Sequence, residues 1–284
     1  MVQTICVCGA GTMGSSIAQA ASQHQFHVIL YDVSTDMLGK AKTAMQSNLQ
    51  TLVQKNKISA ETATDILSRI QFVSDINDCL ADLVIEAIVE KPEVKVALFN
   101  QLAEVNHSET VLATNTSSLS VTEIAKKVKH PERVAGMHFF NPATIMKLVE
   151  VVATPFSNQQ TIDAITETAR QMDKTPVLCQ DSPGFIVNHV ARPYYIEALK
   201  LAEQGVTDFQ TIDTLLEATG FKMGPFRLMD LIGNDINYAV SCQVYEALGK
   251  PERLQPSSIQ KEKVENGHLG RKTGKGYYGY ETKQ

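Results

Sequence analysis

Short apolar runs alternate with segments of helical periodicity through the first 180 residues of the chain. The runs are "TICVCGA", "HVILYD", "ADLVIEAI", "TVLATN", "RVAGMHFF", "MKLVEVV" and "TPVLC". They are short and rich in β-branched residues, so they predict strands rather than helices. Near-continuous apolar strands separated by helices are typical of a parallel sheet that is covered on both faces. The pattern therefore predicts an α/β fold that begins with a Rossmann-type, doubly wound sheet.

One interval between strands, at about residues 33–71, is too long for a single helix. Its sequence reads as two helices, "STDMLGKAKTAMQSNLQTLVQKN" and "SAETATDILSRI". Ser34 or Thr35 is placed to cap the first helix, and Ser59 is placed to cap the second. A helical hairpin inserted in such a domain needs a reason, and we expect that reason to be substrate binding.

After "QDSPG" the periodicity is helical only. We predict a first domain over residues 1–183 and an all-α C-terminal domain over residues 184–284. Pro193 should kink or interrupt the first helix of this domain. Thr207 and Gln210 have capping-box spacing at the start of "TDFQTIDTLLEATG". The helices carry more apolar faces than about 100 residues need for a core, so we expect a homodimer formed through residues 185–284, with "YYIEAL" and "INYAV" as candidate contacts.

Composition excludes several functional classes. The chain has 284 residues, 43% hydrophobic and 20% charged, and a net charge of −5, so nothing favours nucleic acid or an anionic membrane as a partner. No apolar run approaches the length of a membrane span. The five cysteines contain no CxxC pair, which argues against a disulfide framework or a metal site. Together with an N-terminus that lacks a signal-peptide pattern, this composition predicts a cytoplasmic protein.

The segment "CGAGTMG" places Gly9, Gly11 and Gly14 in GxGxxG spacing between a predicted strand and a predicted helix. In that context the loop predicts dinucleotide binding, with the pyrophosphate at the helix N-terminus. Asp32 ends the next strand, where a carboxylate accepts hydrogen bonds from the adenosine ribose and repels a 2′-phosphate. These residues predict NAD rather than NADP. A purely structural turn is the alternative, and the loop alone also leaves FAD open.

The stretch "GMHFFNPATIMKLVEVV" carries His138 and Glu150 within two apolar runs. A carboxylate in an apolar strand costs several kcal/mol unless it is paired. A neutral imidazole suits proton transfer near neutral pH, and a carboxylate on its far nitrogen orients it. The two residues thus predict a catalytic pair. Spacing alone leaves open that His138 is a core histidine and Glu150 an edge-strand acid.

Six motifs in order carry a family resemblance: "GAGTMG", "DLVIEAIVE", "ATNTSSLS", "GMHFFNPATIMKLVEVV", "DSPGFIVN" and "GRKTGKGYYGY". Together they resemble the L-3-hydroxyacyl-CoA dehydrogenases of the short 3-hydroxybutyryl-CoA type, over nearly the whole chain. The resemblance implies NAD-dependent oxidation of a short-chain (S)-3-hydroxyacyl-CoA to the 3-oxoacyl-CoA, or the reverse, in fatty-acid or related acyl-CoA metabolism. It also implies a Rossmann domain and a helical domain through which the enzymes dimerise. The expected substrate is 3-hydroxybutyryl-CoA.

The resemblance also implies roles for single residues. His138 matches the catalytic base, Glu150 its carboxylate partner, and Ser117 a contact of the substrate hydroxyl and the nicotinamide. Asn188 matches a further polar group of the active site. Cofactor contacts beyond the three glycines and Asp32 are implied for Thr12, Met13, Glu90, Lys95, Asn115, Ser117, Asn141 and Lys272. In the hairpin, Lys55 matches a lysine that binds coenzyme A, and Asn48 stands where relatives often have a serine for the coenzyme.

Structural alternatives remain for several of these residues. Ser120 with Glu123 makes a capping box next to Ser117, and both roles can hold together. Asn188 has the alternative of a buried amide bonded to backbone. Lys272 belongs either to a solvated basic tail or to a tail that folds over an anionic ligand.

Three other functions compete with the leading one. In the first, the substrate carries a distal carboxylate, as a 3-hydroxyadipyl group does. A β-hydroxyacid dehydrogenase acting on free acids shares the same domain plan, but that class uses a catalytic lysine in its helical domain. A non-catalytic, crystallin-like relative would be marked by loss of His138 or Glu150, and both residues are present.

Overall fold

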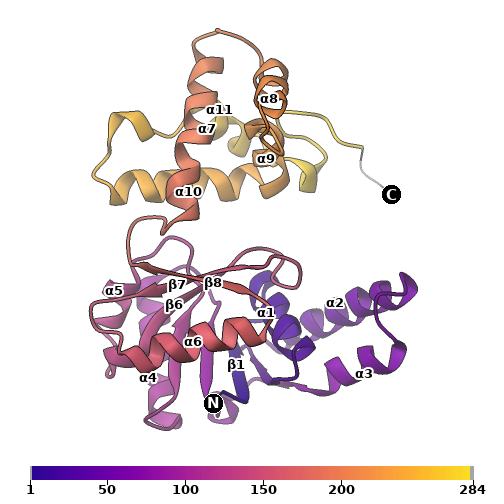
Figure 1. The fold of residues 1–284 in the computed structure, drawn as a ribbon, viewed down its shortest axis with the longest axis vertical. Coiled ribbons are helices and arrows are strands. Elements are labelled where there is room, and N and C mark those ends of the chain that lie inside the picture. Colours follow the sequence, from indigo (N-terminus) through magenta and orange to yellow (C-terminus); the bar gives the residue numbers. More distant parts are fainter. Residues whose placement is uncertain (1, 282–284) are drawn as a thin grey trace. The chain divides into compact units, whose positions relative to one another are not determined.

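The computed structural model describes residues 2–281. The chain divides into two compact units, Met1–Ser182 and Pro183–Gln284 (Figure 1). The division falls one residue before the boundary predicted from the sequence. All the strands described belong to the first unit, and helices make up the second.

The first unit is built on one eight-stranded sheet in the order β3-β2-β1-β4-β5-β6-β7-β8. The strands are β1 (Thr4–Cys8), β2 (His27–Tyr31), β3 (Ile70–Val73), β4 (Leu83–Glu86), β5 (Val111–Thr114), β6 (Val134–Phe139), β7 (Leu148–Ala153) and β8 (Thr175–Gln180). Each apolar run quoted above forms one of them. Every residue of β4 and β5 is buried, as expected of central strands covered on both faces. The order of the first six strands is that of a Rossmann domain.

The sheet is mixed, not wholly parallel as predicted. β6 and β7 pair antiparallel, whereas the other neighbouring strands pair parallel. The cause is the connection over residues 140–147, which is too short to hold the crossover helix that a parallel pair needs. α6 (Gln159–Gln171) supplies such a crossover between β7 and β8. The antiparallel pairing places His138 directly opposite Glu150.

Helices α1 (Thr12–Gln23), α4 (Pro92–Val105), α5 (Val121–Ala125) and α6 pack with the sheet. The insertion forms two helices, α2 (Thr35–Gln54) and α3 (Ala60–Ser68), as predicted. Ser34 caps α2 by accepting a hydrogen bond from the N–H of Met37, and Ser59 caps α3 in the same way. α2 buries one stripe at helical spacing, namely Leu38, Ala41, Met45 and Leu49. The hairpin is therefore fixed by one face and leaves the rest of its surface to solvent (Figure 1).

The second unit contains α7 (Val187–Glu203), α8 (Phe209–Ala218), α9 (Pro225–Ile232), α10 (Asn234–Ala247) and α11 (Ser258–Glu265). Short 3-10 turns lie at Ile76–Asp78, Pro131–Arg133, Glu252–Leu254 and Arg271–Thr273. α7 continues through Pro193, so the proline does not interrupt it. The cap of α8 is Asp208, which accepts from the N–H of Thr211, and not Thr207. Within residues 2–281, no helix combines the length and apolar character needed to cross a bilayer.

Candidate active site

The glycine loop joins β1 to α1 in a geometry that excludes side chains. A Cβ on Gly14 would lie 1.8 Å from the carbonyl oxygen of Gly9, and a Cβ on Gly9 would lie 2.6 Å from that of Ala87. Gly9 also has φ +103, which favours glycine. A Cβ on Gly11 would meet no atom within 4 Å. The loop is thus closely packed behind and open at Gly11, a geometry that fits a pyrophosphate at the start of α1.

Asp32 lies at the end of β2 beside this loop. Its carboxylate accepts hydrogen bonds from the N–H of Ala10 at 2.8 Å and from the N–H of Ser34 at 2.9 Å. These bonds orient the carboxylate, which keeps lone pairs for further donors such as ribose hydroxyls. In the first turn of α1, Thr12 is exposed and Met13 is partly buried. The residues present therefore fit the adenosine and pyrophosphate parts of NAD.

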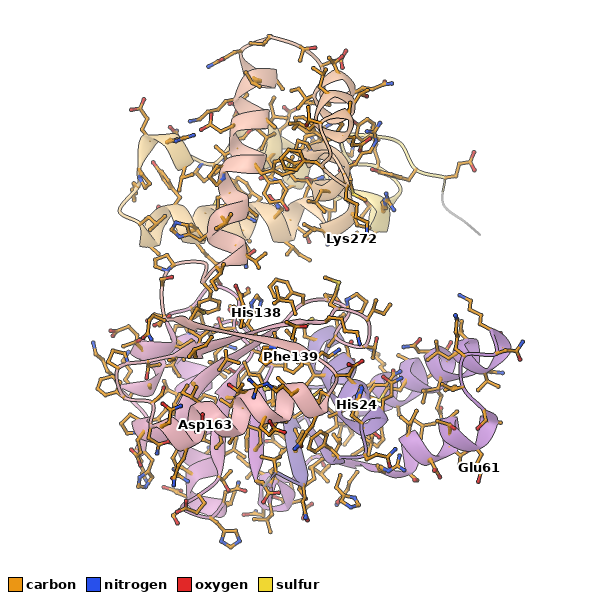
Figure 2. The ribbon with its side chains drawn as sticks, in the orientation of Figure 1. His24, Glu61, His138, Phe139, Asp163 and Lys272 are labelled. Atoms are coloured by element: carbon orange, nitrogen blue, oxygen red, sulfur yellow. The ribbon has the colours of Figure 1, made fainter. Side chains whose placement is uncertain are left out.

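His138 and Glu150 meet, as predicted from the sequence. The distance from Nδ1 of His138 to Oε2 of Glu150 is 2.7 Å. His138 is 5% exposed and Glu150 is 0% exposed. The contact follows from the antiparallel register, because directly opposed residues project on the same face of a sheet. Figure 2 shows His138 on the first unit, and the ring of Phe140 packs 4.6 Å from the His138 ring, centroid to centroid.

Two asparagines predicted to contact the cofactor flank this pair. Asn115 follows β5, and its side-chain oxygen accepts from the N–H of Phe139 at 2.8 Å. Its own N–H donates to the carbonyl of Glu86 at 2.8 Å. Asn115 thus ties the ends of β4, β5 and β6 together next to His138. Asn141 is exposed in the loop after β6, before a cis peptide bond to Pro142.

Ser117, Glu90 and Lys95 lie together at the carboxyl ends of β4 and β5. The N–H of Ser117 donates to Oε1 of Glu90 at 3.3 Å. Ser120 caps α5 by accepting from the N–H of Glu123, so Ser117 does not serve as that cap. Lys95 is 1% exposed and its ammonium lies 3.0 Å from Oε2 of Glu90. The ammonium of Lys95 is therefore buried next to the carboxylate of Glu90.

The two residues predicted to bind coenzyme A differ in their surroundings. Lys55 follows the last turn of α2 with an exposed side chain. Asn48 is exposed too, but its amide donates to Oε1 of Gln19 on α1 at 3.2 Å. Lys55 thus reaches solvent at the hairpin turn, whereas Asn48 helps to join α2 to α1.

Asn188 and Lys272 belong to the helical unit. Asn188 lies in the first turn of α7, partly buried, and its carbonyl accepts from Nε of Arg192 at 2.9 Å. The ammonium of Lys272 contacts both carboxylate oxygens of Asp235 at 2.6 and 2.7 Å. The tail that holds Lys272 therefore folds back onto its own unit.

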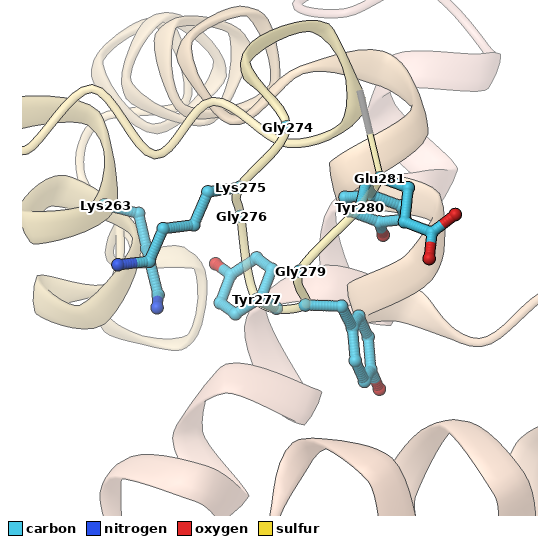
Figure 3. A pocket seen from close by; sticks show the side chains of 9 residues that line it. Lys263, Gly274, Lys275, Gly276, Tyr277, Gly279, Tyr280 and Glu281 are labelled. Carbon is cyan, nitrogen blue, oxygen red and sulfur yellow. The ribbon is translucent and has the colours of Figure 1, made fainter. Parts of the chain in front are cut away.

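A pocket of about 500 Å³ lies in that tail and is lined by Lys263 and residues 274–281 (Figure 3). The buried carboxylate of Asp230 holds the tail by accepting from the N–H groups of Tyr277 and Tyr278, both at 3.0 Å. None of the residues predicted to bind cofactor or substrate lines this pocket. The tail is fixed by backbone hydrogen bonds that no sequence motif had indicated.

Sequence reasoning missed one buried acid of the first unit. Glu86 is the last residue of β4, is 0% exposed, and lies 2.6 Å from the ammonium of Lys95. The available signal was a carboxylate inside the apolar run "ADLVIEAI", the same signal that drew attention to Glu150.

A Rossmann fold whose glycine loop and Asp32 fit NAD, with a buried histidine–glutamate pair across β6 and β7, is the architecture of an NAD-dependent dehydrogenase. The model for "3-hydroxyacyl-CoA dehydrogenase, NAD binding domain" matches residues 4–182, and that for "3-hydroxyacyl-CoA dehydrogenase, C-terminal domain" matches residues 184–280. The chain belongs to the 3-hydroxyacyl-CoA dehydrogenase family.

Three relatives illustrate the similarity. The 3-hydroxyadipyl-CoA dehydrogenase of Escherichia coli K12 is 48% identical over 279 residues, which cover 98% of this chain and 59% of that protein. A probable 3-hydroxybutyryl-CoA dehydrogenase of Deinococcus radiodurans is 38% identical, covering 96% of this chain and 99% of its own. The crystal structure of a 3-hydroxybutyryl-CoA dehydrogenase from Escherichia coli K12 superimposes with a TM-score of 0.95 at 47% identity, covering 100% of this chain and 61% of that one. The chain thus spans about three fifths of the Escherichia coli proteins it matches.

Proposed function

We propose that this protein oxidises the C3 hydroxyl of a short-chain (S)-3-hydroxyacyl-CoA with NAD, or catalyses the reverse reduction. The observation that carries the proposal is the buried 2.7 Å contact between His138 and Glu150. It supplies an oriented acid–base group in the NAD-binding unit. Retention of both residues speaks against a non-catalytic relative.

In this reaction His138 accepts the hydroxyl proton while the C3 hydrogen leaves as hydride and a carbonyl forms. Because Glu150 contacts Nδ1, the proton is received at Nε2, the other ring nitrogen. Glu150 fixes the tautomer and stabilises the imidazolium as it forms. NAD, when bound, supplies the hydride acceptor. Ser117 is assigned to the substrate hydroxyl, and Asn188 is assigned as a further polar group of the site.

Two acyl-CoA compounds are candidates for the substrate. 3-Hydroxybutyryl-CoA is proposed first, in line with the names of two of the relatives above. The 48% identical relative is named for 3-hydroxyadipyl-CoA, which favours a distal carboxylate as the second candidate. Steady-state kcat/KM over acyl-CoA substrates with and without that carboxylate, in both directions, separates them. Faster turnover of free 3-hydroxybutyrate than of either thioester would contradict the proposal.

The decisive variant is Glu150→Gln, which keeps the shape of the side chain and removes its charge. An amide can donate to the imidazole and hold the wrong tautomer. We expect kcat to fall by roughly 10²-fold or more, within the range that positioned acid–base groups contribute. NADH affinity, measured by fluorescence titration, should change little, because neither residue is assigned to the adenosine half.

The matched control is Glu167→Gln on the exposed surface of α6, which should leave kcat unchanged. The kcat–pH profile of Glu150→Gln should also differ from that of the wild type. If Glu150→Gln keeps the wild-type kcat and the wild-type kcat–pH profile, Glu150 is a structural strand residue and has no catalytic role.

The remaining proposals concern the setting of the enzyme. We infer a homodimer formed through the helical unit, with acyl-CoA as the small-molecule partner. We also infer a cytoplasmic location, which is supported by free cysteines, three of them fully buried in the first unit, as suits a reducing compartment.

A further inference from the structure

The loop over residues 140–147, between β6 and β7, contains one compact turn. Directly after Asn141, the carbonyl of Pro142 accepts hydrogen bonds from the N–H groups of Ile145 and Met146 at 3.0 and 2.9 Å. Asn141 itself is exposed, and a contact with the cofactor is implied for it. Since Asn141 is the residue before the turn, the position of the turn also sets the position of Asn141.

Lys174, the residue before β8, holds this turn through its ammonium. The ammonium donates to the carbonyl of Ala143 at 2.5 Å and to that of Met146 at 3.0 Å. Ala143 is 0% exposed and Lys174 is 8% exposed, so the contact is buried. The main-chain N–H of Lys174 donates to the carbonyl of Ala169, in the last turn of α6, at 2.9 Å. The turn is therefore tied to a helix that packs on the sheet.

The ammonium of Lys174 is buried without a counter-charge. Within residues 2–281 it forms no ion pair, and the carboxylate of the adjacent Asp173 contacts Lys147 instead. Burial, together with the positive charge of Lys147, lowers the pKa of Lys174. A buried ion of this kind is often no more stabilising than an apolar side chain of similar volume. What the lysine adds is a pair of charge-assisted hydrogen bonds that select one position of the turn.

We propose that Lys174 is a positioning residue for the reaction, and that it acts through Asn141 by fixing the turn that follows it. The inference rests on the proposed function and on the cofactor contact implied for Asn141. Hydride transfer requires the cofactor to lie within a narrow range of positions relative to the substrate. A displaced Asn141 would therefore slow the reaction even if every group that touches substrate were present.

Loss of the ammonium should affect the cofactor and spare the catalytic pair. The two carbonyls would lose their donors, and the turn would shift toward water or another donor. Asn141 would shift with it. His138 and Glu150 would stay opposite each other, because strand pairing sets their register. A defect in cofactor placement with an intact acid–base pair is the signature of this role.

The first test is Lys174→Met in the whole protein, which removes the donors and keeps a side chain of similar length. We expect kcat for 3-hydroxybutyryl-CoA oxidation to fall by roughly 10- to 10²-fold, because a displacement of about 1 Å in an active site can cost 10²-fold. NADH affinity, measured by fluorescence titration, should fall as well. KM for the acyl-CoA should change little. Wild-type kcat and NADH affinity, with only a lower Tm, would overturn the proposal.

A double-mutant cycle with Asn141→Ala tests the route of the effect. In the Asn141→Ala background, Lys174→Met should change kcat and NADH affinity by less than about threefold, because the residue that Lys174 positions has lost its side chain. An equal loss in both backgrounds would show that Lys174 does not act through Asn141. If Lys174→Met does not fold, Lys174→Gln, whose side chain is one atom shorter, replaces it in the cycle, and the same loss in both backgrounds contradicts the proposal.

Arg133 provides a matched control for the loss of a buried cation. Its guanidinium is also buried, and it donates to the carbonyls of His107 and Thr110 at 2.8 and 3.4 Å, before the start of β6. No residue of that loop is assigned to the site. Arg133→Met should therefore lower Tm and leave kcat unchanged. A loss of kcat equal to that of Lys174→Met would mean that both variants report only a general loss of stability.

A second control and the binding assay keep the remaining outcomes separate. Lys147→Met removes the neighbouring exposed ammonium, which is 61% exposed, and should leave kcat unchanged. A wild-type protein inactive on every acyl-CoA would defeat the proposed function. The NADH titrations of the cycle need no turnover, so they would then decide the role of Lys174 on their own.

Discussion

Glu86 and Glu150 are two fully buried carboxylates in strands of the sheet. The sequence predicted a role for Glu150 and none for Glu86. Glu150 was assigned because its partner His138 lies in the same apolar motif. The partner of Glu86 is Lys95, from the helix that follows its strand, and an acid inside a strand does not indicate which helix will supply a cation. At the residue scale, the sequence therefore predicted chemistry where both partners share a motif and missed it where the fold brings them together.

Asp32 gives the first prediction at this scale. Asp32→Ser should lower kcat/KM with NAD and raise it with NADP, because the variant loses a ribose acceptor and a negative charge that repels the 2′-phosphate. We expect the NAD-to-NADP ratio to fall at least roughly tenfold, the contribution of one charge-assisted hydrogen bond. Asp36→Ser, an exposed acid in the first turn of α2, is the control. An unchanged NAD-to-NADP ratio of kcat/KM in Asp32→Ser would contradict the assignment of Asp32 to the adenosine ribose.

Cys179 gives the second prediction at the residue scale. Burial, with the negative charges of Glu150 and Asp181, raises the pKa of the Cys179 thiol to about 11. Since only the thiolate is nucleophilic, alkylation by iodoacetamide at pH 8 should be roughly 10²-fold slower than for an ordinary cysteine of pKa about 8.5. The rate, followed by mass spectrometry, should rise about tenfold per pH unit up to that pKa.

The alkylation rate of Cys179 also reports the loss of the Glu150 charge, in an assay that needs no enzymatic turnover. Glu150→Gln removes one of the negative charges that raise the Cys179 pKa, so alkylation at pH 8 should accelerate. Rapid labelling of Cys179 in the wild type would contradict the prediction.

Among the elements, strands and helices were predicted well, and the pairing direction was wrong only between β6 and β7. An apolar run reports that a strand is buried, but the antiparallel turn from β6 to β7 depends on the length of the connection over residues 140–147. The caps show a similar limit. Ser59 was predicted correctly, and Ser34 was one of the two residues predicted for the cap of α2. Thr207 was predicted for α8, but the cap is Asp208, because both residues can cap and only the chain's entry into α8 decides between them.

The α2–α3 hairpin carries the prediction at this scale. Lys55→Ala should raise KM for acyl-CoA up to about fivefold, because a solvated ion pair contributes no more than about 1 kcal/mol. KM for NADH should stay nearly unchanged. The effect should be larger at low salt, where exposed charges are less screened. Lys57→Ala, exposed in the same turn, is the control. Normal acyl-CoA affinity of Lys55→Ala at low salt would show that the hairpin has another role.

For the whole molecule, the exposed apolar side chains of the helical unit support a dimer. Leu231 and Ile236 are each 49% exposed. Of the two segments suggested by the sequence, "YYIEAL" holds Tyr195 and Ile196, which are buried in their own unit. "INYAV" contains Ile236 and is the better candidate contact. The sequence predicted the surplus of apolar surface, but only packing shows which residues it exposes.

Ile236→Asp should therefore shift the protein from dimer to monomer, because a charge placed in an apolar interface is costly unless it is paired. Light scattering at micromolar concentration measures the change. Leu80→Asp, at a position 53% exposed in the first unit, should leave the dimer intact. A monomeric wild type would refute the prediction outright.

The hairpin from β6 to β7 also determines where this chain tolerates a change in length. Strand pairing sets the position of His138 opposite Glu150, so residues added to or removed from the loop over 140–147 need not disturb the pair. The loop's fold is separately fixed by Lys174, whose ammonium donates to the carbonyls of Ala143 and Met146. A single insertion inside either strand has the opposite result, since it turns every following side chain to the other face of the sheet. Loop grafting between relatives is thus feasible at this turn if Asn141 is kept, while the two strands must be transferred together.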